Sequence, residues 1–236
     1  GAVDVASHAK VKTISYGKGE GLDLRIDQIN LLAGGASARV LWKGAKIGEL
    51  VISVPGEHNL LNAAAVLAVG LELGLSPTAL LDGLVKFHGA GRRFELKGAV
   101  NGIRVIDDYG HHPVEMAATL SAVRGAFPNK RLLLAFQPHR YTRTRDCFGD
   151  FVKVIESVDA LVLTDVYPAG EARIPGADGQ SLFKALRKVA ASEFVKDVSL
   201  MPEAILNVAR DGDVIITMGA GSVSTVAAKL MELSHG

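Results

Sequence analysis

The chain has 236 residues, of which 48% are apolar and 22% are charged, so it is long enough to bury substantial cores and is expected to form two compact units. Lys and Arg exceed Asp and Glu by only 26 to 25, and aromatic residues make up 6%, a balance that argues against a nucleic-acid partner. No apolar run approaches the roughly 20 residues needed to cross a bilayer, so no membrane partner is expected either.

The sequence pattern of residues 1–90 predicts a strand-rich unit that ends in two helices. Short extended patterns separated by Gly-rich turns predict an antiparallel meander. Two helices follow it, over 59–73 and, after the cap at Ser76 and Pro77, to about residue 87. Such a unit would be unusual as a free-standing domain, and we expect the rest of it to precede Gly1. The strand patterns cover residues 11–16, 22–32, 37–42 and 46–54.

From residue 91 onward, strand patterns alternate with helical ones. This rhythm predicts a doubly wound, mostly parallel α/β sheet, and a junction with hinge-like glycines at residues 89–91. The expected strands are 104–107, 131–136, 160–164, 198–201 and 213–217, and the expected helices are near 113–125, 145–157, 180–191, 202–210 and 222–233.

Cysteine usage and the start of the chain bear on location. Cys147 is the only cysteine and cannot form a disulfide within the chain, and the first residues lack the apolar core of a signal peptide. We therefore expect a cytoplasmic protein in which Cys147 has a structural role.

Charged, imidazole and aromatic side chains follow two of the predicted strands. Residues 107–113 read Asp-Asp-Tyr-Gly-His-His-Pro, and residues 137–145 read Gln-Pro-His-Arg-Tyr-Thr-Arg-Thr-Arg. Open α/β sheets bind ligands at the carboxyl ends of their strands, so both segments are expected to border one crevice.

The types of residue in these segments suggest their chemistry. Arg140, Arg143 and His139 suit a small anionic ligand, because a guanidinium binds a carboxylate or phosphate through two parallel hydrogen bonds. Tyr109 and His111 could stack on such a ligand or bond to it. A zinc site is disfavoured, since adjacent histidines rarely converge on one ion and no Cys and no Glu/His helix spacing completes a ligand set. We therefore predict no metal ligands in this chain.

Four further segments could be functional, and three of them also allow a structural interpretation. Asn59 and Asn62, three apart at a helix start, could hold an anion or a purine edge, although spacing alone favours an ordinary cap at Asn59. Arg93 could reach a phosphate or be solvated. The Met218-to-Ser224 loop resembles part of a dinucleotide fingerprint but lacks its third glycine. The long loop at 167–176 is of a kind that is often functional, although its ligand is not evident.

Taken together, five ordered motifs resemble the Mur ligase family, and the His-His-Pro and Gln-Pro-His-Arg forms resemble its alanine-adding branch. The motifs are Pro55-Gly-Glu-His-Asn-Leu-Leu-Asn62, Gly91-Arg-Arg-Phe-Glu95, Asp107 to Pro113, Gln137 to Asp146, and Val166-Tyr-Pro-Ala-Gly-Glu171 with Ile174 to Asp178.

The resemblance implies an architecture and a set of reactants. Residues 1–90 would be the end of a central ATPase domain, and 91–236 a carboxy-terminal Rossmann-like domain that brings in the amino acid. The implied reaction joins L-alanine to UDP-N-acetylmuramate through an acyl phosphate in peptidoglycan synthesis, with ATP and magnesium as cofactors. The magnesium ligands would lie upstream of this chain.

The resemblance also implies roles for individual residues. Arg93 and Asp108 match catalytic positions, Asn59 and Asn62 match nucleotide-binding positions, and a third group matches positions near the amino acid and product. That group is Tyr109, His111, His139, Arg140 and Arg143.

One departure from the family bears on activity. No Gly-Lys-Ser/Thr phosphate loop occurs in the sequence, so we expect the chain alone to be inactive. Three alternatives stay open: a family member that uses another amino acid, a non-catalytic nucleotide-binding module with a Rossmann-like fold, and a piece that docks onto a separately supplied amino-terminal part.

Overall fold

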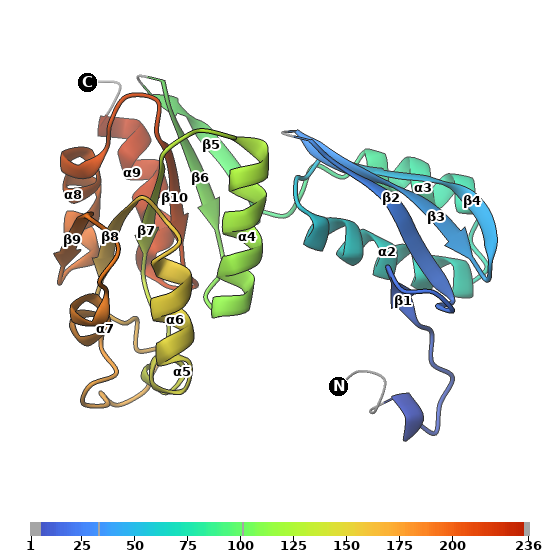
Figure 1. Ribbon diagram of the computed structural model, residues 1–236, viewed down its shortest axis with the longest axis horizontal. Helices are drawn as coiled ribbons and strands as arrows, with labels where there is room; N and C mark the ends of the chain where they lie inside the picture. Colours follow the sequence, from blue (N-terminus) through green and yellow to red (C-terminus); the bar gives the residue numbers. More distant parts are fainter. Residues whose placement is uncertain (1–5, 33, 101, 234–236) are drawn as a thin grey trace. The chain divides into compact units, whose positions relative to one another are not determined.

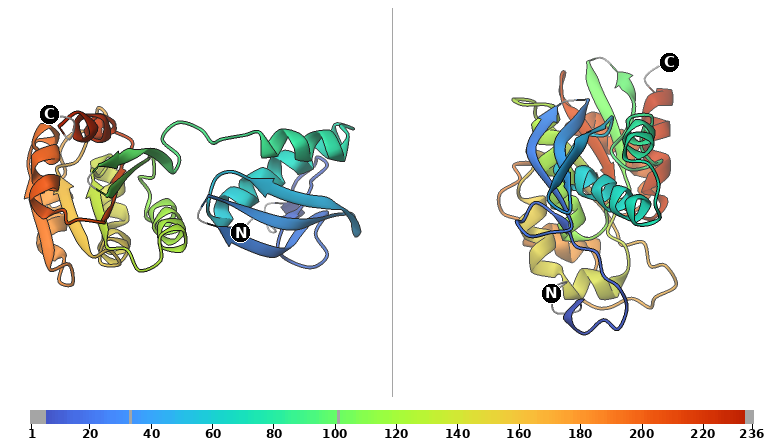
Figure 2. Two further views of the ribbon diagram at one scale, coloured as in Figure 1. Left: turned by 90° about the horizontal axis from the view of Figure 1, so that it is seen from above. Right: turned by 90° about the vertical axis from the view of Figure 1, so that its right-hand side faces the viewer.

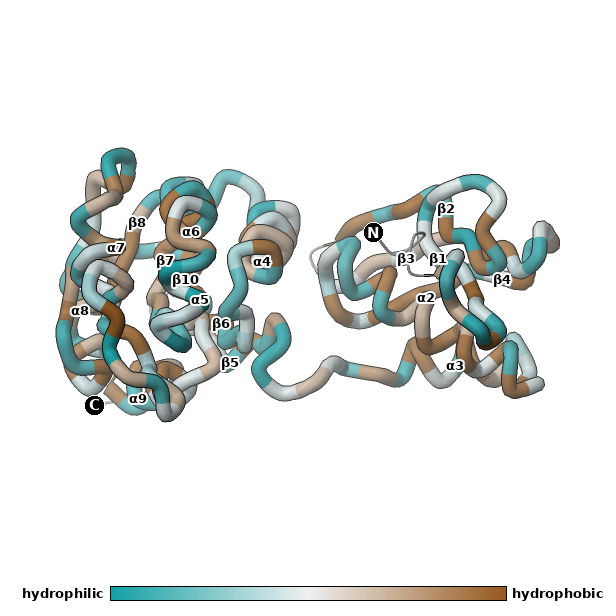
Figure 3. The backbone as a smooth tube through the Cα atoms, turned by 90° about the horizontal axis from the view of Figure 1, so that it is seen from below, coloured by the Kyte–Doolittle hydropathy of each residue, from teal (hydrophilic) through white to brown (hydrophobic). Residues whose placement is uncertain are grey.

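The computed structural model describes residues 6–32, 34–100 and 102–233. The chain divides into two compact units, residues 1–88 and 89–236, each of which is described by itself (Figure 1). Hydrophobic and hydrophilic stretches alternate along the backbone of both (Figure 3). None of the helices within the described ranges is both long and apolar enough to span a membrane.

The first unit is a four-stranded sheet packed against two helices (Figure 1). Its strands lie in the order β1-β2-β3-β4, antiparallel except for the parallel pair β1 and β2. The inward face of the sheet packs on Leu60, Ala64 and Leu67 of α2. The elements are β1 (Tyr16–Gly17), β2 (Leu24–Leu32), β3 (Gly35–Trp42), β4 (Ala45–Ile52), α2 (Glu57–Glu72) and α3 (Pro77–Val85).

The strand expected over 11–16 is wrong for most of its length, because only Tyr16 and Gly17 pair with β2. The preceding residues are largely exposed, so they gain little from a place in the sheet. Asp23 instead holds this segment, accepting hydrogen bonds from the backbone N–H of Ser15 at 2.8 Å and from its hydroxyl at 2.7 Å. The meander over the remaining three strands is present.

The second unit is a six-stranded sheet between two helical layers (Figures 1 and 2). The strand order is β5-β6-β10-β7-β8-β9, and only β5 runs antiparallel. This confirms the predicted doubly wound, mostly parallel sheet. Its strands are β5 (Glu95–Val100), β6 (Ile103–Asp108), β7 (Leu132–Phe136), β8 (Ala160–Thr164), β9 (Ala191–Val195) and β10 (Val214–Met218).

Two hydrophobic cores lie on opposite faces of this sheet. Strand residues that include Ile106, Leu134 and Leu161 pack against α4, α6 and α7, while their neighbours in sequence pack against α8 and α9. Because successive side chains of a strand point to opposite faces, a fully apolar strand suits burial on both sides. The helices are α4 (Pro113–Ala126), α5 (Tyr141–Asp146), α6 (Phe148–Ile155), α7 (Gly179–Ala185), α8 (Met201–Val208) and α9 (Val226–Leu233), with short 3-10 turns at Val198–Leu200 and Ser222–Thr225.

The strand expected over 198–201 is wrong. That segment is a 3-10 turn leading into α8, and the edge strand β9 lies earlier, at Ala191–Val195. Asp197 caps the turn by accepting a hydrogen bond from the N–H of Ser199 at 2.8 Å, and Pro202, which has no N–H for a strand ladder, stands in the first turn of α8. The apolar run therefore begins a helix.

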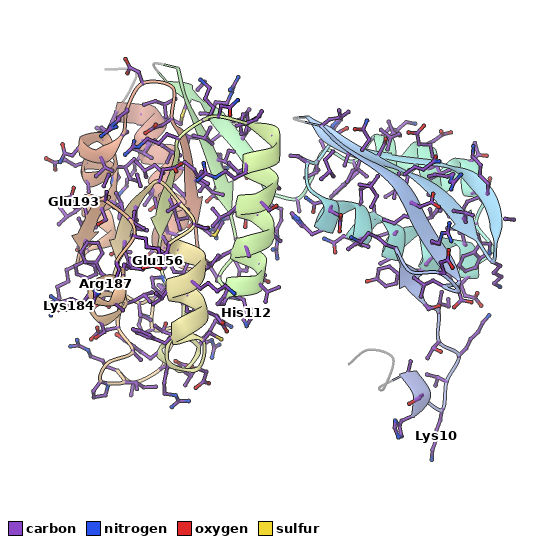
Figure 4. The ribbon with its side chains drawn as sticks, in the orientation of Figure 1. Lys10, His112, Glu156, Lys184, Arg187 and Glu193 are labelled. Atoms are coloured by element: carbon purple, nitrogen blue, oxygen red, sulfur yellow. The ribbon has the colours of Figure 1, made fainter. Side chains whose placement is uncertain are left out.

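Two of the expected helices are shorter than the sequence suggests. The helix expected over 180–191 ends at Ala185, and Glu156 at the end of α6 accepts a hydrogen bond at 2.7 Å from the N–H of Arg187 in the segment that follows (Figure 4). The helix expected over 145–157 is interrupted at Cys147, between α5 and α6. Strand β5, at Glu95–Val100, was not among the strands expected from the sequence.

A buried ion pair ties together the starts of β7 and β10. The Arg131 guanidinium lies 2.5 Å from the Asp213 carboxylate, whose side chain is only 2% exposed. Asp213 also accepts a hydrogen bond from the N–H of Arg210 at 2.9 Å. The pair lies at the amino end of these strands, opposite to the edge where the sequence predicts the site.

Replacement of Arg131 by Ala should destabilise the second unit by about 3 kcal/mol, because it leaves the Asp213 carboxylate buried without its partner. Urea unfolding followed by far-UV circular dichroism measures this loss. Tryptophan fluorescence would not, because the single tryptophan, Trp42, lies in the first unit. Arg145→Ala is the control, because its ion pair with Asp146 is more than half exposed and should contribute below about 1 kcal/mol. Equal losses in the two variants would contradict the prediction.

Candidate active site

The carboxyl ends of β6, β10, β7 and β8 lie along one edge of the sheet, because these strands are parallel neighbours. The chain leaves β6 and β7 toward the layer that contains α4 and α6, and leaves β10 toward the layer that contains α9. Open α/β sheets bind their ligands where the chain reverses direction in this way between adjacent strands. Every predicted site residue of the second unit lies at this edge or in the segment just before β5.

Asp107 and Asp108 end β6, and both are buried, at 1% and 3% exposure. Since successive strand residues point to opposite faces, one of these two residues would be expected to face the site; both are buried instead. Asp107 is 2.9 Å from the Arg92 guanidinium and accepts a hydrogen bond from the Thr217 hydroxyl at 2.8 Å. Asp108 accepts bonds from the N–H groups of Phe94 at 2.9 Å and Gly110 at 2.7 Å. Burial raises the pKa of Asp108 above its ordinary value.

These carboxylates fix the segment that carries Arg93. Arg92 is tied to Asp107 and also donates to the Gly219 carbonyl, while its own carbonyl accepts from the N–H of Tyr109 at 2.6 Å. Arg92 thus has a structural role in spite of its position beside Arg93. Arg93 is exposed, and its guanidinium lies 5.3 Å from the centre of the Tyr109 ring. The segment is held so that Arg93 remains available to a ligand.

A row of four rings crosses the edge from one loop to the next. Ring centres are 5.3 Å apart between Tyr109 and His111, 5.7 Å between His111 and His139, and 5.4 Å between His139 and Tyr167. The last pair is nearly parallel, at 13°. The row joins the loops after β6, β7 and β8, and it brings Tyr109, His111 and His139 together as the sequence predicted.

Arg140 and Arg143 flank this row. Arg143 donates to the His139 carbonyl at 3.0 Å, and the Arg140 guanidinium, whose side chain is 48% exposed, lies 3.5 Å from the Glu171 carboxylate. Arg145 points elsewhere and pairs with Asp146. Arg140, at the N-cap of α5, and Arg143, within α5, are therefore the two arginines that could bind an anion beside the rings.

The imidazoles differ in their electrostatic surroundings. Burial, together with the nearby positive groups of His111, Arg143 and Arg140, lowers the pKa of His139 below its ordinary 6.5, so this ring is neutral at pH 7. Glu115 accepts from the N–H groups of His111 and His112 at 3.1 and 3.2 Å. Although burial opposes it, this bonding and the charge of His111 lower the pKa of Glu115. Glu115 therefore anchors the His-His segment as an anion.

Sequence reasoning did not single out Tyr167 and Glu171 as site residues, although they belong to the long loop marked as functional. The backbone of Tyr167 bridges to the segment 138–140, and Glu171 accepts hydrogen bonds from the N–H and the hydroxyl of Thr142 at 3.0 and 2.7 Å. The signal that could have identified them is their position on the loop after β8. Because β8 pairs in parallel with β7, the loops after both strands begin at the same edge of the sheet.

The glycines of the loop after β10 are required by close packing within the second unit. A Cβ atom on Gly221 would lie 2.6 Å from Gln137 Oε1 and 2.6 Å from the Tyr167 ring, and one on Gly219 would lie 2.6 Å from the Gln137 carbonyl. Gln137 is buried and accepts from the N–H of Val223 at 2.9 Å. These glycines let the β10 loop approach the neighbouring loops closely.

His112 and Cys147 contribute to the structure around the site. His112 lies at the start of α4 (Figure 4), and its Nε2 is 3.7 Å from the Cys147 sulfur. Within the described ranges, no group of three or more His, Cys, Asp or Glu side chains is arranged to hold a metal ion. We therefore assign no metal ligands there.

Asn59 and Asn62 belong to the first unit. Helix α2 begins at Glu57, so Asn59 lies in its first turn and is not its cap; its side chain donates to the Pro55 carbonyl at 2.8 Å. Asn62, one turn later, is exposed. Asn62 is therefore the freer of the two amides to meet a ligand.

The chain belongs to the Mur ligase family: the model described as "Mur ligase, glutamate ligase domain" matches residues 92–221, which include the whole row of rings. Its curated relatives include the UDP-N-acetylmuramate–L-alanine ligases of Chromobacterium violaceum, 53% identical over 229 residues, and of Burkholderia multivorans, 51% identical over 226. Both matches cover 93% of this chain and 49% of the relative, so the chain spans about half the length of these proteins.

Solved structures show the same fold. The UDP-N-acetylmuramate-alanine ligase MurC of Thermotoga maritima matches 94% of this chain and 48% of its own length, with a TM-score of 0.79 and 27% identity. The MurF ligase of Thermotoga maritima, solved in complex with ADP, matches 98% of this chain and 51% of its own with a TM-score of 0.71, and at 17% identity it supports the fold alone.

The base of the loop that carries Tyr167 and Glu171 generates a pH prediction. Asp178 caps α7 through the N–H of Ser181 at 2.8 Å and pairs with Arg173 at 2.5 Å. Although burial opposes it, these bonds lower the pKa of Asp178 from 3.8 to about 2. Its contribution to stability is therefore present above about pH 4 and lost as pH falls toward 2.

The measurable consequence is a pH-dependent difference between the wild type and Asp178→Asn. The wild type should be more stable at pH 5, and its advantage should shrink by up to about 2 kcal/mol as pH falls to 2, because 1 pKa unit corresponds to about 1.4 kcal/mol. Urea unfolding of both proteins at several pH values measures it. A pH-independent difference would show that the Asp178 carboxylate is not held as an anion.

Proposed function

We propose that this chain is the amino-acid-binding portion of an ATP-dependent ligase that joins L-alanine to UDP-N-acetylmuramate in peptidoglycan synthesis. The observation that carries the proposal is the row of rings at the sheet edge, with Arg93 beside Tyr109 at one end and Arg140 and Arg143 beside a neutral His139 further along it. The names of the relatives at 53% and 51% identity support the choice of substrates.

In the proposed reaction, ATP transfers its γ-phosphoryl group to the muramate carboxylate and ADP leaves. The L-alanine amine then attacks the acyl carbon, forming the C–N bond as the bond to the phosphate oxygen breaks and inorganic phosphate departs with the electron pair. Negative charge accumulates at the reacting centre, and preorganised guanidinium groups stabilise such charge. Arg93 is proposed to act on the transferred phosphoryl group, and Arg140 and Arg143 on the alanine carboxylate.

Asp108 is proposed to contribute by holding the segment that presents Arg93. Its oxygens are occupied by the backbone N–H groups of Phe94 and Gly110, so it acts through residues 92–94. Tyr109 and His111 are proposed to line the side of the amino-acid site, and Asn59 and Asn62 to contact nucleotide. The described residues provide no set of acidic ligands for magnesium, so no step is assigned to that ion here.

The test is a protein in which this chain follows the amino-terminal half of the Chromobacterium violaceum relative. We expect phosphate release that requires ATP, UDP-N-acetylmuramate and L-alanine together, with serine and glycine giving lower kcat/KM. The 236-residue chain alone should release none, because it has no phosphate loop.

Each result of this test has a definite meaning. A preference for serine or glycine would replace L-alanine with another amino acid in the proposal. Tight binding of NAD by the chain, measured by calorimetry, would favour the non-catalytic nucleotide-binding alternative.

Within the same protein, Arg140→Lys should raise the KM for L-alanine by about tenfold or more and change kcat less. A lysine ammonium carries the charge but cannot form the paired hydrogen bonds of a guanidinium with a carboxylate. Arg145→Lys, on the same helix but paired with Asp146, is the matched control and should leave KM unchanged. A larger effect of Arg145→Lys would move the carboxylate site to the outer face of α5.

A further inference from the structure

The loops after β7 and β8 are joined by backbone hydrogen bonds as well as by the ring contact of His139 with Tyr167. The N–H of Tyr167 donates to the Pro138 carbonyl at 2.8 Å, and the N–H of Arg140 donates to the Tyr167 carbonyl at 2.9 Å. These bonds form an isolated parallel bridge beyond the ends of both strands. The loop after β8 therefore fixes the position of the Arg140 backbone.

Arg140 has a backbone conformation that needs such support. Its φ is 74°, a left-handed value that is uncommon for residues other than glycine, and it stands at the N-cap of α5 without capping the helix through its side chain. An unusual backbone of this kind persists only where the surroundings hold it. The bridge to Tyr167 holds Arg140 on its amino side.

Glu171 supplies the support on the other side. It accepts from the N–H of Thr142, in the first turn of α5, and from the Thr142 hydroxyl, so it does for this helix what a capping side chain would do. Its Oε1 is also 3.5 Å from the Arg140 guanidinium. The hydrogen bonds from Thr142, with the charge of Arg140, lower the pKa of Glu171, which is therefore an anion at neutral pH.

These contacts argue against Glu171 as a direct ligand of the incoming ammonium group. Both of its oxygens already accept hydrogen bonds, and its side chain is only 18% exposed. Arg140, in contrast, is 48% exposed and has further N–H groups beyond the one near Glu171. The arrangement orients the arginine and leaves it available.

We propose that Glu171 is a positioning residue that fixes the backbone and the guanidinium of Arg140 for the carboxylate of the incoming amino acid, with Tyr167 holding the same loop against His139. This inference rests on the proposed function, because it takes the ligand of Arg140 to be an amino acid. It adds a residue from the loop after β8 to a site built from the loops after β6 and β7.

The test uses the full 236-residue chain labelled with 15N. L-Alanine is titrated into the wild type and into Glu171→Gln, which keeps the size of the side chain but removes its charge. We expect the Kd of the variant to rise by about tenfold or more, as for loss of a charge-assisted contact. Asp178→Asn, which alters the same loop but leaves Glu171 intact, and Glu203→Gln, an exposed residue on α8, are the controls and should bind like the wild type.

A second measurement reads the charge of Glu171 directly. Glu171 opposes the lowering of the His139 pKa, so its removal should lower that pKa further, and NMR titration of the His139 ring reports the change. An unchanged titration in Glu171→Gln would show that the Glu171 charge is not held near the His139 ring. Thr142→Val, which removes one hydrogen bond and keeps the charge, should weaken L-alanine binding less and leave the titration unmoved.

The outcomes separate this inference from the proposed function. No L-alanine binding by the wild type, with the His139 titration shifted as expected, would reject the amino acid as ligand while the Glu171 contact stands. Wild-type affinity in Glu171→Gln would overturn the positioning role while the proposed function stands. Equal loss in Glu171→Gln and Asp178→Asn would show that order in the loop, and not Glu171 itself, governs binding.

Discussion

The parallel pairing of β10 with both β6 and β7 is the constraint on which the site depends. It brings Asp107 beside Thr217 and Phe136 beside Met218, so three loops that are far apart in sequence begin at one edge. Backbone hydrogen bonding fixes this alignment to within a residue, since a shift by one would turn every buried side chain to the opposite face. Such a shift would exchange the side chains of a strand between the two hydrophobic cores and disturb the packing of both, so the packing of the cores also holds the site together.

Burial sorts the charged groups at this edge into two kinds. Arg92 and the two aspartates are enclosed and bonded to each other or to backbone groups, so their contribution is to hold the segment before β5 and the start of the loop after β6. Arg93 and Arg140 are exposed. Adjacent arginines such as Arg92 and Arg93 thus have different roles, which depend on whether a partner lies within the fold.

The sequence predicted the elements whose physics is local. Strands β6, β7, β8 and β10 are apolar runs bounded by polar residues, and the structure contains all four. The edge strand β9 was missed because its sequence, Ala191-Ser-Glu-Phe-Val195, has no apolar run, whereas the run after Asp197 forms a helix through a cap and a proline. At an edge, pairing with one neighbour decides the outcome, and a local pattern does not contain it.

The same distinction applies to the site. Tyr109, His111, His139, Arg140 and Arg143 belong to two short motifs at strand ends, and motif and topology together were sufficient to gather them. Glu171 meets Thr142 across 29 residues, and Tyr167 fits beside Gly221 only because that residue has no side chain.

Neither of these contacts leaves a periodic signal in the sequence. The electrostatics of the site also depend on contacts between distant segments, because burial and the nearby Arg143 and Arg140 lower the pKa of His139 while Glu171 opposes this shift. An anion that enters this site meets fixed positive charge that the fold has already brought together, so the cost of gathering it is met during folding and not during binding.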